Sequence, residues 1–347
     1  MLRQIVAAAL VLFVPTGVSA EPSQLPERVN WTIEDSDKHD AAEIVQFSLS
    51  YRINTEKSRG QWMHSRSIPL AELQGLTASQ YVSAEGAPVR FRLVRDAGSF
   101  DCEGIVRRRR GTGDCRFLPD LGFAAALRQR GIGNPTPTQL FALANANIGL
   151  GYADELQRQG YARPSVNDLV QAADHGASYD YLRGLGELGY RAGTVANLIR
   201  MRDHGVTTSY IRELAAYGLR NIPAETLVQM RDHGVSPRYI GELRRLGYSN
   251  LSIPELIRMR DHGVTANYVS ELGSHGIRFG PDELIRLRSH GVSAAYVGEL
   301  RKLGYRELSA EDLVRLRSHG VSTEFIRRVN AGGRRSVEEL VKQRTSG

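Results

Sequence analysis

The sequence lacks the short motifs that mark common enzyme sites. It contains no His-Glu-x-x-His, no Gly-x-Ser-x-Gly and no Gly-x-x-x-x-Gly-Lys segment. One dinucleotide-type pattern, Gly184-x-Gly186-x-x-Gly189, lies inside a predicted helix with no strand before it, so it indicates no nucleotide site. We therefore expect a protein that is not an enzyme and holds neither a cofactor nor a metal. A hydrolase with an unrecognised site in the N-terminal domain is kept as an alternative.

Long apolar runs are missing after residue 20. Residues 1–20 are typical of a signal peptide, with Arg3 before an apolar stretch over 5–14 and small residues ending in Ala20 before the expected cut. That stretch is shorter than a membrane span, and no later segment approaches about 18 apolar residues. We expect an exported protein, periplasmic or secreted, without a transmembrane segment.

Cysteine is scarce, since Cys102 and Cys115 are the only two. They fall in the segments 98–106 and 113–118, which look like the two strands of a hairpin. An even cysteine count across a hairpin of an exported protein indicates a disulfide, which would stabilise the fold by about 3 kcal/mol. Redox catalysis is the alternative, and the lack of a Cys-x-x-Cys motif argues against it.

What the sequence does have is a long internal repeat. A His-Gly pair followed by Ala or Val recurs along the second half of the chain with steps of 29, 29, 29, 28 and 29 residues. A fixed period of this size predicts a solenoid of small units that stabilise one another by stacking. The histidines that mark the period are His175, His204, His233, His262, His290 and His319.

Each repeat predicts two short helices. In the repeat that begins near residue 194, apolar side chains recur at helical spacing, and Gly205 and Gly218 stand where left-handed residues end helices. Starts are marked as well, because Ser252 and Glu255 have the spacing of a capping box. Residues 123–132 match a lone second helix before the array, and residues 336–344 match a lone first helix after it.

These patterns predict an α+β multidomain chain. Residues 21–118 alternate with period two, as in the segment 45–52, and predict about six strands in a small antiparallel β domain. A sandwich and a half-barrel both fit, with Trp31 and Trp62 in or beside the core. Residues 119–347 predict an all-α solenoid of seven helix pairs with a half-repeat at each end.

The repeated histidines could bind metal, act as a pH-responsive row or support helix ends. Neighbouring copies are expected about 10 Å apart, too far to share one zinc ion. We interpret them as structural residues that help to satisfy helix C-terminal carbonyls. The accompanying arginine row (Arg202, Arg231, Arg260, Arg288 and Arg317) and glutamate row (Glu213, Glu242, Glu271 and Glu299) predict ion pairs within or between repeats.

The densest charge in the chain is the arginine run, made of Arg107, Arg108, Arg109 and Arg110. It predicts either a solvated hairpin tip or a site for an anionic component of the cell envelope, such as a phosphorylated glycolipid. The net charge of +7 and the pI near 9.5 also fit nucleic acid. Expected export argues against a nucleic-acid partner.

One stretch of sequence resembles a known group of proteins. The segment from Leu256 to Thr265 (Leu-Ile-Arg-Met-Arg-Asp-His-Gly-Val-Thr), followed by Tyr268-Val-x-Glu-Leu, resembles tandem helical repeats appended to bacterial membrane metallopeptidases of the beta-lactam-sensor type. It is also similar to exported repeat proteins of unassigned function, and the segments 69–76 and 89–100 resemble the β region before those repeats. The peptidase's zinc motif and membrane helices have no counterpart here. The resemblance implies a sensory or regulatory interaction module.

The combined expectation is an exported, non-enzymatic scaffold that binds a protein or peptide on the concave face of a right-handed helical stack. Solvent-facing positions that vary between repeats would carry specificity. The candidates are Thr208, Arg238, Asn267 and Ala295 at the start of the second helix of each pair. The alternative from another class is an envelope-associated polyanion binder that uses the arginine run.

Overall fold

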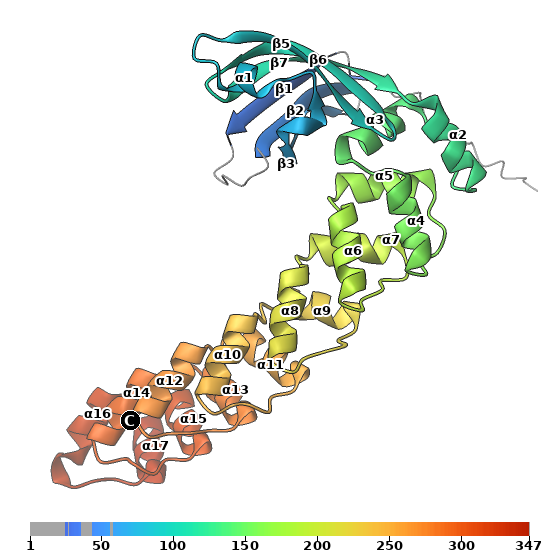
Figure 1. Cartoon of the computed structure of the whole chain (residues 1–347). Helices are drawn as coiled ribbons and strands as arrows, with labels where there is room; N and C mark the ends of the chain where they lie inside the picture. The colour runs from blue at the N-terminus through green and yellow to red at the C-terminus, as the bar shows by residue number, and fades with distance from the viewer. Residues whose placement is uncertain (1–24, 27, 36–43, 56–57, 347) are drawn as a thin grey trace, which may run out of the picture. The chain divides into compact units, whose positions relative to one another are not determined.

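The computed structural model describes residues 25–26, 28–35, 44–55 and 58–346, without the side chains of residues 52–62. The expected signal peptide and the Trp62 side chain lie outside the described part. The chain divides into two compact units, Met1–Leu150 and Gly151–Gly347. Each unit is coherent within itself, and each is shown in Figure 1.

The first unit is built on one curled antiparallel sheet that forms a half-barrel. Its strand order is β3-β2-β1-β7-β6-β5-β4, so seven strands are present where about six were expected. Of the two predicted topologies, the half-barrel is confirmed and the sandwich of two sheets is wrong. The elements are β1 (Val29–Asp35), β2 (Ile44–Thr55), β3 (Ser58–Pro69), η1 (Leu70–Glu72), β4 (Leu73–Gln74), α1 (Ala78–Val82), β5 (Ala87–Arg95), β6 (Gly98–Arg107), β7 (Arg110–Pro119), α2 (Leu121–Gln129) and α3 (Pro137–Ala146).

Trp31 lies at the centre of the first unit and is fully buried. Its indole lies over Gly104, Gly111 and Gly113, where an added Cβ would come within 2.6 to 3.0 Å of the ring. The indole Nε1 donates a hydrogen bond to the Glu103 carbonyl at 3.0 Å. Glycine in these two strands therefore provides the space that the largest core side chain needs.

The change from strands to helices and the limit of the first unit fall at different places. β7 ends at Pro119 and helices follow, close to the expected boundary at residues 118 and 119. The compact unit continues to Leu150 because α3 is packed against β6 and β7. Phe141 of α3 makes edge-on contacts with Tyr51 and Phe117, with ring centroids 4.8 and 5.3 Å apart.

The second unit is an all-α solenoid in two rows. Odd-numbered helices contact odd-numbered neighbours and even-numbered helices contact even-numbered ones, and Figure 1 shows the two rows. In sequence, seven helix pairs run from α3 to α16, with α2 and α17 as the expected half-repeats. The remaining bounds are α4 (Leu150–Arg158), α5 (Val166–Asp174), α6 (Tyr179–Glu187), α7 (Val195–Asp203), α8 (Thr208–Ala216), α9 (Ala224–Asp232), α10 (Pro237–Arg245), α11 (Ile253–Asp261), α12 (Ala266–Ser274), α13 (Pro281–Ser289), α14 (Ala294–Lys302), α15 (Ala310–Ser318), α16 (Thr323–Val329), η2 (Asn330–Gly332) and α17 (Val337–Thr345).

Helix ends follow the local sequence rules. Ser252 and Glu255 form the expected capping box at the start of α11. Gly205 ends α7 with a φ of 69°, and the Val206 amide then donates to the Met201 carbonyl at 2.9 Å, which is the Schellman pattern. Helices of nine residues are too short to be stable alone, so contact with neighbouring repeats supplies their stability.

Two glycines inside the even-numbered row face bulky residues of the preceding repeat. A Cβ on Gly241 would lie 2.3 Å from the Tyr217 hydroxyl, and one on Gly298 would lie 2.5 Å from the His275 ring. Other repeats place leucine where Tyr217 and His275 stand, as at Leu246. At these two places, a glycine on one repeat therefore leaves room for a larger side chain on the repeat before it.

Candidate functional site

The two cysteines form the expected disulfide. Cys102 of β6 and Cys115 of β7 lie directly opposite each other, with their Cα atoms 4.0 Å apart. Both side chains are buried on the core face of the sheet. This position fits a structural brace that joins two neighbouring strands.

The arginine run forms the tip of the β6–β7 hairpin, as expected. Arg107 and Arg110 are paired across the strands, which leaves Arg108 and Arg109 as the two turn residues. The tip rests on the end of α1, because the Arg108 amide donates to Ser83 at 2.7 Å and the Arg109 amide to Tyr81 at 2.8 Å. The arginine run is thus part of the fold as well as a surface charge.

The four guanidinium groups of the run have different surroundings. Arg107 Nε donates to the Ala84 carbonyl at 2.9 Å. Arg109 lies over the Tyr81 ring and 3.7 Å from the Asp35 carboxylate. Within the described part of the chain, Arg108 and Arg110 are exposed and have no ion-pair partner. The charge available to a partner therefore comes mainly from these two residues.

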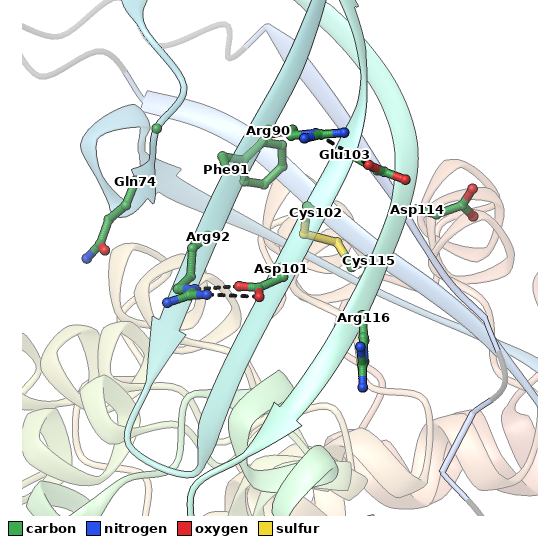
Figure 2. A pocket seen from close by; sticks show the side chains of 11 residues that line it. Gln74, Arg90, Phe91, Arg92, Asp101, Cys102, Glu103, Asp114, Cys115 and Arg116 are labelled. Atoms are coloured by element: carbon green, nitrogen blue, oxygen red, sulfur yellow. Dashed lines mark hydrogen bonds and ion pairs between the residues drawn. A yellow bond between two sulfur atoms is a disulfide. The ribbon is translucent and has the colours of Figure 1, made fainter.

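The outer face of β5, β6 and β7 carries a groove of about 840 Å³ that also reaches Gln74 of β4, shown in Figure 2. Arg92 forms a two-point ion pair with Asp101, and Arg90 Nε lies 3.6 Å from Glu103. The hydrogen bond from Arg92 lowers the pKa of Asp101, which makes this carboxyl a poor proton donor at neutral pH. The hydrolase alternative gains no support from these paired carboxylates.

The repeated histidines lie at helix ends and contact the next repeat. In the first five of the six, the ring Nδ1 meets a side chain near the end of the following odd-numbered helix, rather than a carbonyl of its own helix. His175 meets Asp203 at 3.0 Å and His262 meets Ser289 at 2.8 Å. The same contact joins His204 to Asp232, His233 to Asp261 and His290 to Ser318, while His319 of the last pair has no such contact among the described residues. The helix-end location holds, and the expected carbonyl contact is wrong.

The arginine row also has partners other than those expected. Arg231 lies over the Tyr210 ring with its guanidinium carbon 5.0 Å from the centroid, and Arg288 lies over Tyr268 at 4.9 Å. Arg288 Nε also donates to the carbonyl of Gly263, a helix-terminating glycine of the preceding repeat, at 3.1 Å. The expected ion pairs of this row are wrong. The other members contact tyrosines in the same way: Arg202 with Tyr181, Arg260 with Tyr239 and Arg317 with Tyr296.

These tyrosines tie each repeat to the next. Tyr210 donates its hydroxyl proton to the Val235 carbonyl at 2.8 Å, and Tyr239 does the same to Val264. Equivalent bonds join Tyr181 to Val206, Tyr268 to Val292 and Tyr296 to Val321. The sequence interpretation missed this role, since it counted the tyrosines only as apolar. The signal was present, because each of these tyrosines is followed by an arginine 20 or 21 residues later.

The variable positions lie on the exposed side of the even-numbered helices, with one correction. Arg238, Asn267 and Ala295 each stand four residues after a helix-terminating glycine and are exposed. Thr208 does not share this place. It is half-buried, and a Cβ on Gly184 of the preceding repeat would lie 3.0 Å from its Cγ2. Counting four residues from the helix-terminating glycines gives Asp180, Ser209 and Glu324 as further equivalents, so the variable row is Asp180, Ser209, Arg238, Asn267, Ala295 and Glu324.

The glutamate row lies one turn further along the same helices and pairs locally. Ser209 donates to Glu213 at 2.8 Å, Arg238 to Glu242 at 2.8 Å and Asn267 to Glu271 at 2.7 Å. Glu299 instead contacts Lys302 and also Arg327 of the next repeat. These contacts are at the surface, where each is worth at most about 1 kcal/mol. They orient the variable row more than they stabilise the fold.

No family model, curated protein or solved structure matches the chain. Its class is therefore defined by its own architecture: a disulfide-braced antiparallel half-barrel in one unit and an all-α repeat region. None of the described helices is long and apolar enough to cross a membrane. Within the described residues, no three His, Cys, Asp or Glu side chains are grouped so that they could hold a metal ion.

Proposed function

We propose that the protein is an exported, non-enzymatic scaffold that binds a protein or peptide through the exposed face of its even-numbered helices. The observation that carries this is the contrast between two sets of positions within one chain. The contacts between repeats use the same residue types again and again, with tyrosine to a valine carbonyl and arginine over tyrosine. The variable row, at equally regular places, changes its chemistry at every step.

The variable row presents a carboxylate, a hydroxyl, a guanidinium, an amide, a methyl group and a second carboxylate in order along the solenoid. Successive helices in a row are about 10 Å apart, whereas an extended peptide advances about 3.3 Å per residue. One repeat would therefore meet about every third residue of an extended partner. Six side chains could in this way read a segment of about 15 residues.

Export is the second part of the proposal. It is supported by the composition of residues 1–20 and by the disulfide, since disulfides persist mainly outside reducing compartments. The resemblance to repeats of beta-lactam-sensor-type metallopeptidases adds a proposed sensory or regulatory role. Detection of the mature protein beginning at Glu21 in periplasmic or culture fractions would test export directly.

The binding proposal is tested by affinity capture from envelope extracts with the full mature chain. Replacing Ser209, Arg238, Asn267 and Glu324 together by alanine should abolish capture of the specific partner. A matched control changes three exposed residues of odd-numbered helices to alanine, namely Gln229, Arg286 and Arg315. Capture that survives the first set of changes but is lost with the control set would refute the proposed face.

A second candidate function, polyanion binding at the hairpin tip, is favoured by one specific observation. Arg108 and Arg109 have φ values of 49° and 64°, a region that two-residue turns usually fill with Asn or Gly. Keeping two arginines in such a turn costs stability and places charge at an exposed point. Replacing Arg108 and Arg110 by serine should reduce retention on vesicles that contain anionic lipid, and unchanged retention would dismiss this candidate.

A further inference from the structure

The arginine run is bordered by exposed apolar side chains. Among the described residues, the exposed large hydrophobic side chains are Met63, Val82, Val94, Ile105 and Leu121. Two of them border the hairpin tip: Ile105 lies on β6 two residues before Arg107, and Val82 is the last residue of α1, on whose end the tip rests. We call Val82, Ile105 and the arginine run the tip patch.

Ile105 projects from the outer face of the sheet. The next residue, Val106, is fully buried in the core, so Ile105 points the other way. Across the strands it lies between Pro88 of β5 and Thr112 of β7, which are both smaller and exposed. The isoleucine itself is 62% exposed. It therefore presents an apolar surface to the solvent that the core of the unit does not use.

The loop that follows Val82 holds the apolar and basic parts of the tip patch together. Arg107 Nε donates to the carbonyl of Ala84 in this loop at 2.9 Å. The loop then reaches Gly86, where an added Cβ would lie 3.8 Å from Ile105 Cγ2 and 3.9 Å from Arg107 Cβ. Gly86 has a φ of 93°, which other residues rarely adopt, so no side chain stands there to cover the isoleucine.

The charge around the tip patch is positive but small. Asp35 lies 3.7 Å from Arg109, and two exposed acids lie close in the fold: Glu34 on β1, the strand beside β7, and Glu85 in the loop after α1. The four arginines of the run minus these three carboxylates leave one net positive charge. Charge alone therefore gives a modest attraction, and a partner that also uses the exposed apolar side chains would gain more.

We propose that the tip patch docks on an anionic lipid surface, with Ile105 and Val82 entering the boundary between headgroups and acyl chains while the arginines contact headgroup phosphates. This inference rests on the second candidate function, polyanion binding at the hairpin tip, and names the ligand as a membrane. A lipid surface offers anionic and apolar groups side by side, and attachment to it commonly combines basic and apolar contacts. Arginine suits this boundary, because its stem lies along apolar surface while its charged end stays in water.

The test compares a lipid surface with a soluble polyanion. The full mature chain is co-sedimented with vesicles of phosphatidylglycerol mixed with phosphatidylcholine, and its binding to inorganic polyphosphate is measured separately. Ile105→Ser should lower the partition onto vesicles by at least about fivefold, because one apolar side chain is lost from the lipid boundary. The same variant should bind polyphosphate as tightly as the wild type, because no charge is changed.

Val94→Ser is the matched control. Val94 is an aliphatic residue near the other end of β5, on the same outer face, and is 45% exposed. This change should leave the binding of both vesicles and polyphosphate as it is in the wild type. The change of Arg108 and Arg110 to serine should weaken both kinds of binding, so the three variants separate the apolar contribution from the charge.

A fluorescence measurement tests insertion without removing an apolar side chain. Ile105→Trp should show emission at shorter wavelength when the vesicles are added, because the indole moves from water into the lipid boundary. Val94→Trp should show no such change.

The inference and the second candidate function fail in different ways. Docking on lipid is overturned if Ile105→Ser partitions onto vesicles like the wild type, if Val94→Ser loses as much binding as Ile105→Ser, or if the Ile105→Trp emission does not move. In each of these cases polyphosphate binding that depends on Arg108 and Arg110 would leave the second candidate function standing. A wild-type protein that binds neither vesicles nor polyphosphate would overturn both.

Discussion

Changing Tyr239 to phenylalanine tests the bond that we consider central to the solenoid. The Tyr239 side chain is 5% exposed, and its hydroxyl donates to the carbonyl of Val264, which is fully buried. Phenylalanine keeps the ring under Arg260 but leaves that carbonyl without this donor. The perturbation is therefore confined to one hydrogen bond between neighbouring repeats.

The magnitude follows from what the change leaves behind. A buried carbonyl that loses its hydrogen-bond partner costs about 1 to 3 kcal/mol. Phenylalanine has no hydroxyl to remove from water on folding, and this gain offsets part of that cost. We expect the free energy of unfolding to fall by about 1 to 2 kcal/mol. For a unit of this size, 1 kcal/mol corresponds to about 2 to 4 °C in Tm, so the expected decrease is about 2 to 8 °C.

The assay is urea denaturation followed by helical circular dichroism, with Tyr179→Phe as the matched control. Tyr179 lies at the start of α6, is half-buried, and has no hydroxyl bond among the described residues. The control should change stability by no more than about 0.5 kcal/mol. If Tyr239→Phe is as stable as Tyr179→Phe, the tyrosine bonds do not hold the repeats together and our account of the solenoid is wrong.

Three further predictions use other features of the structure. Replacing Cys102 and Cys115 by serine should lower stability by about 3 kcal/mol, measured by urea denaturation, whereas free thiols in the exported wild type would contradict the brace. Gly241→Ala should destabilise the wild type by about 1 kcal/mol, because the new methyl group meets the Tyr217 hydroxyl. In a Tyr217→Leu background the same change should stabilise the protein, because alanine favours a helix more than glycine does. Additive effects of the two changes in a double-mutant cycle would show that the two sites do not interact. The stabilisation from these tyrosine bonds should be fully present below about pH 10 and should be lost as the pH rises toward 12, because a phenolate cannot donate to a valine carbonyl. Ultraviolet titration that finds every tyrosine ionising near pH 10 in the folded protein would refute this. The physical cause is burial, which raises to about 12 the pKa of Tyr210, Tyr239, Tyr268 and Tyr296.

The helical part of the fold is predictable from sequence because its rules are local. Capping at Ser252, the turn at Gly205 and the two terminal half-repeats all depend on residues a few positions apart. The strand order is different, since it depends on pairings such as that of β1 with β7, which are far apart in the chain. Alternation alone cannot choose between a half-barrel and a sandwich.

Contacts between repeats were harder to predict from the sequence than the helices themselves. The partner of His175 lies 28 residues away on another helix, so no local helix-end rule could identify it. Thr208 was misplaced by one residue, because Ser209 is the residue that stands four positions after Gly205.

The glycines that face Tyr217 and His275 have a consequence for the inheritance of this gene. Near-identical repeats invite unequal recombination, which would delete or duplicate a whole unit. Loss of residues 234–262 would place Tyr217 before the helix that carries Ser270 in place of Gly241, and its hydroxyl would collide with a side chain. The two glycine pairs, Gly241 with Tyr217 and Gly298 with His275, therefore destabilise arrays in which a repeat has been lost or moved at these places.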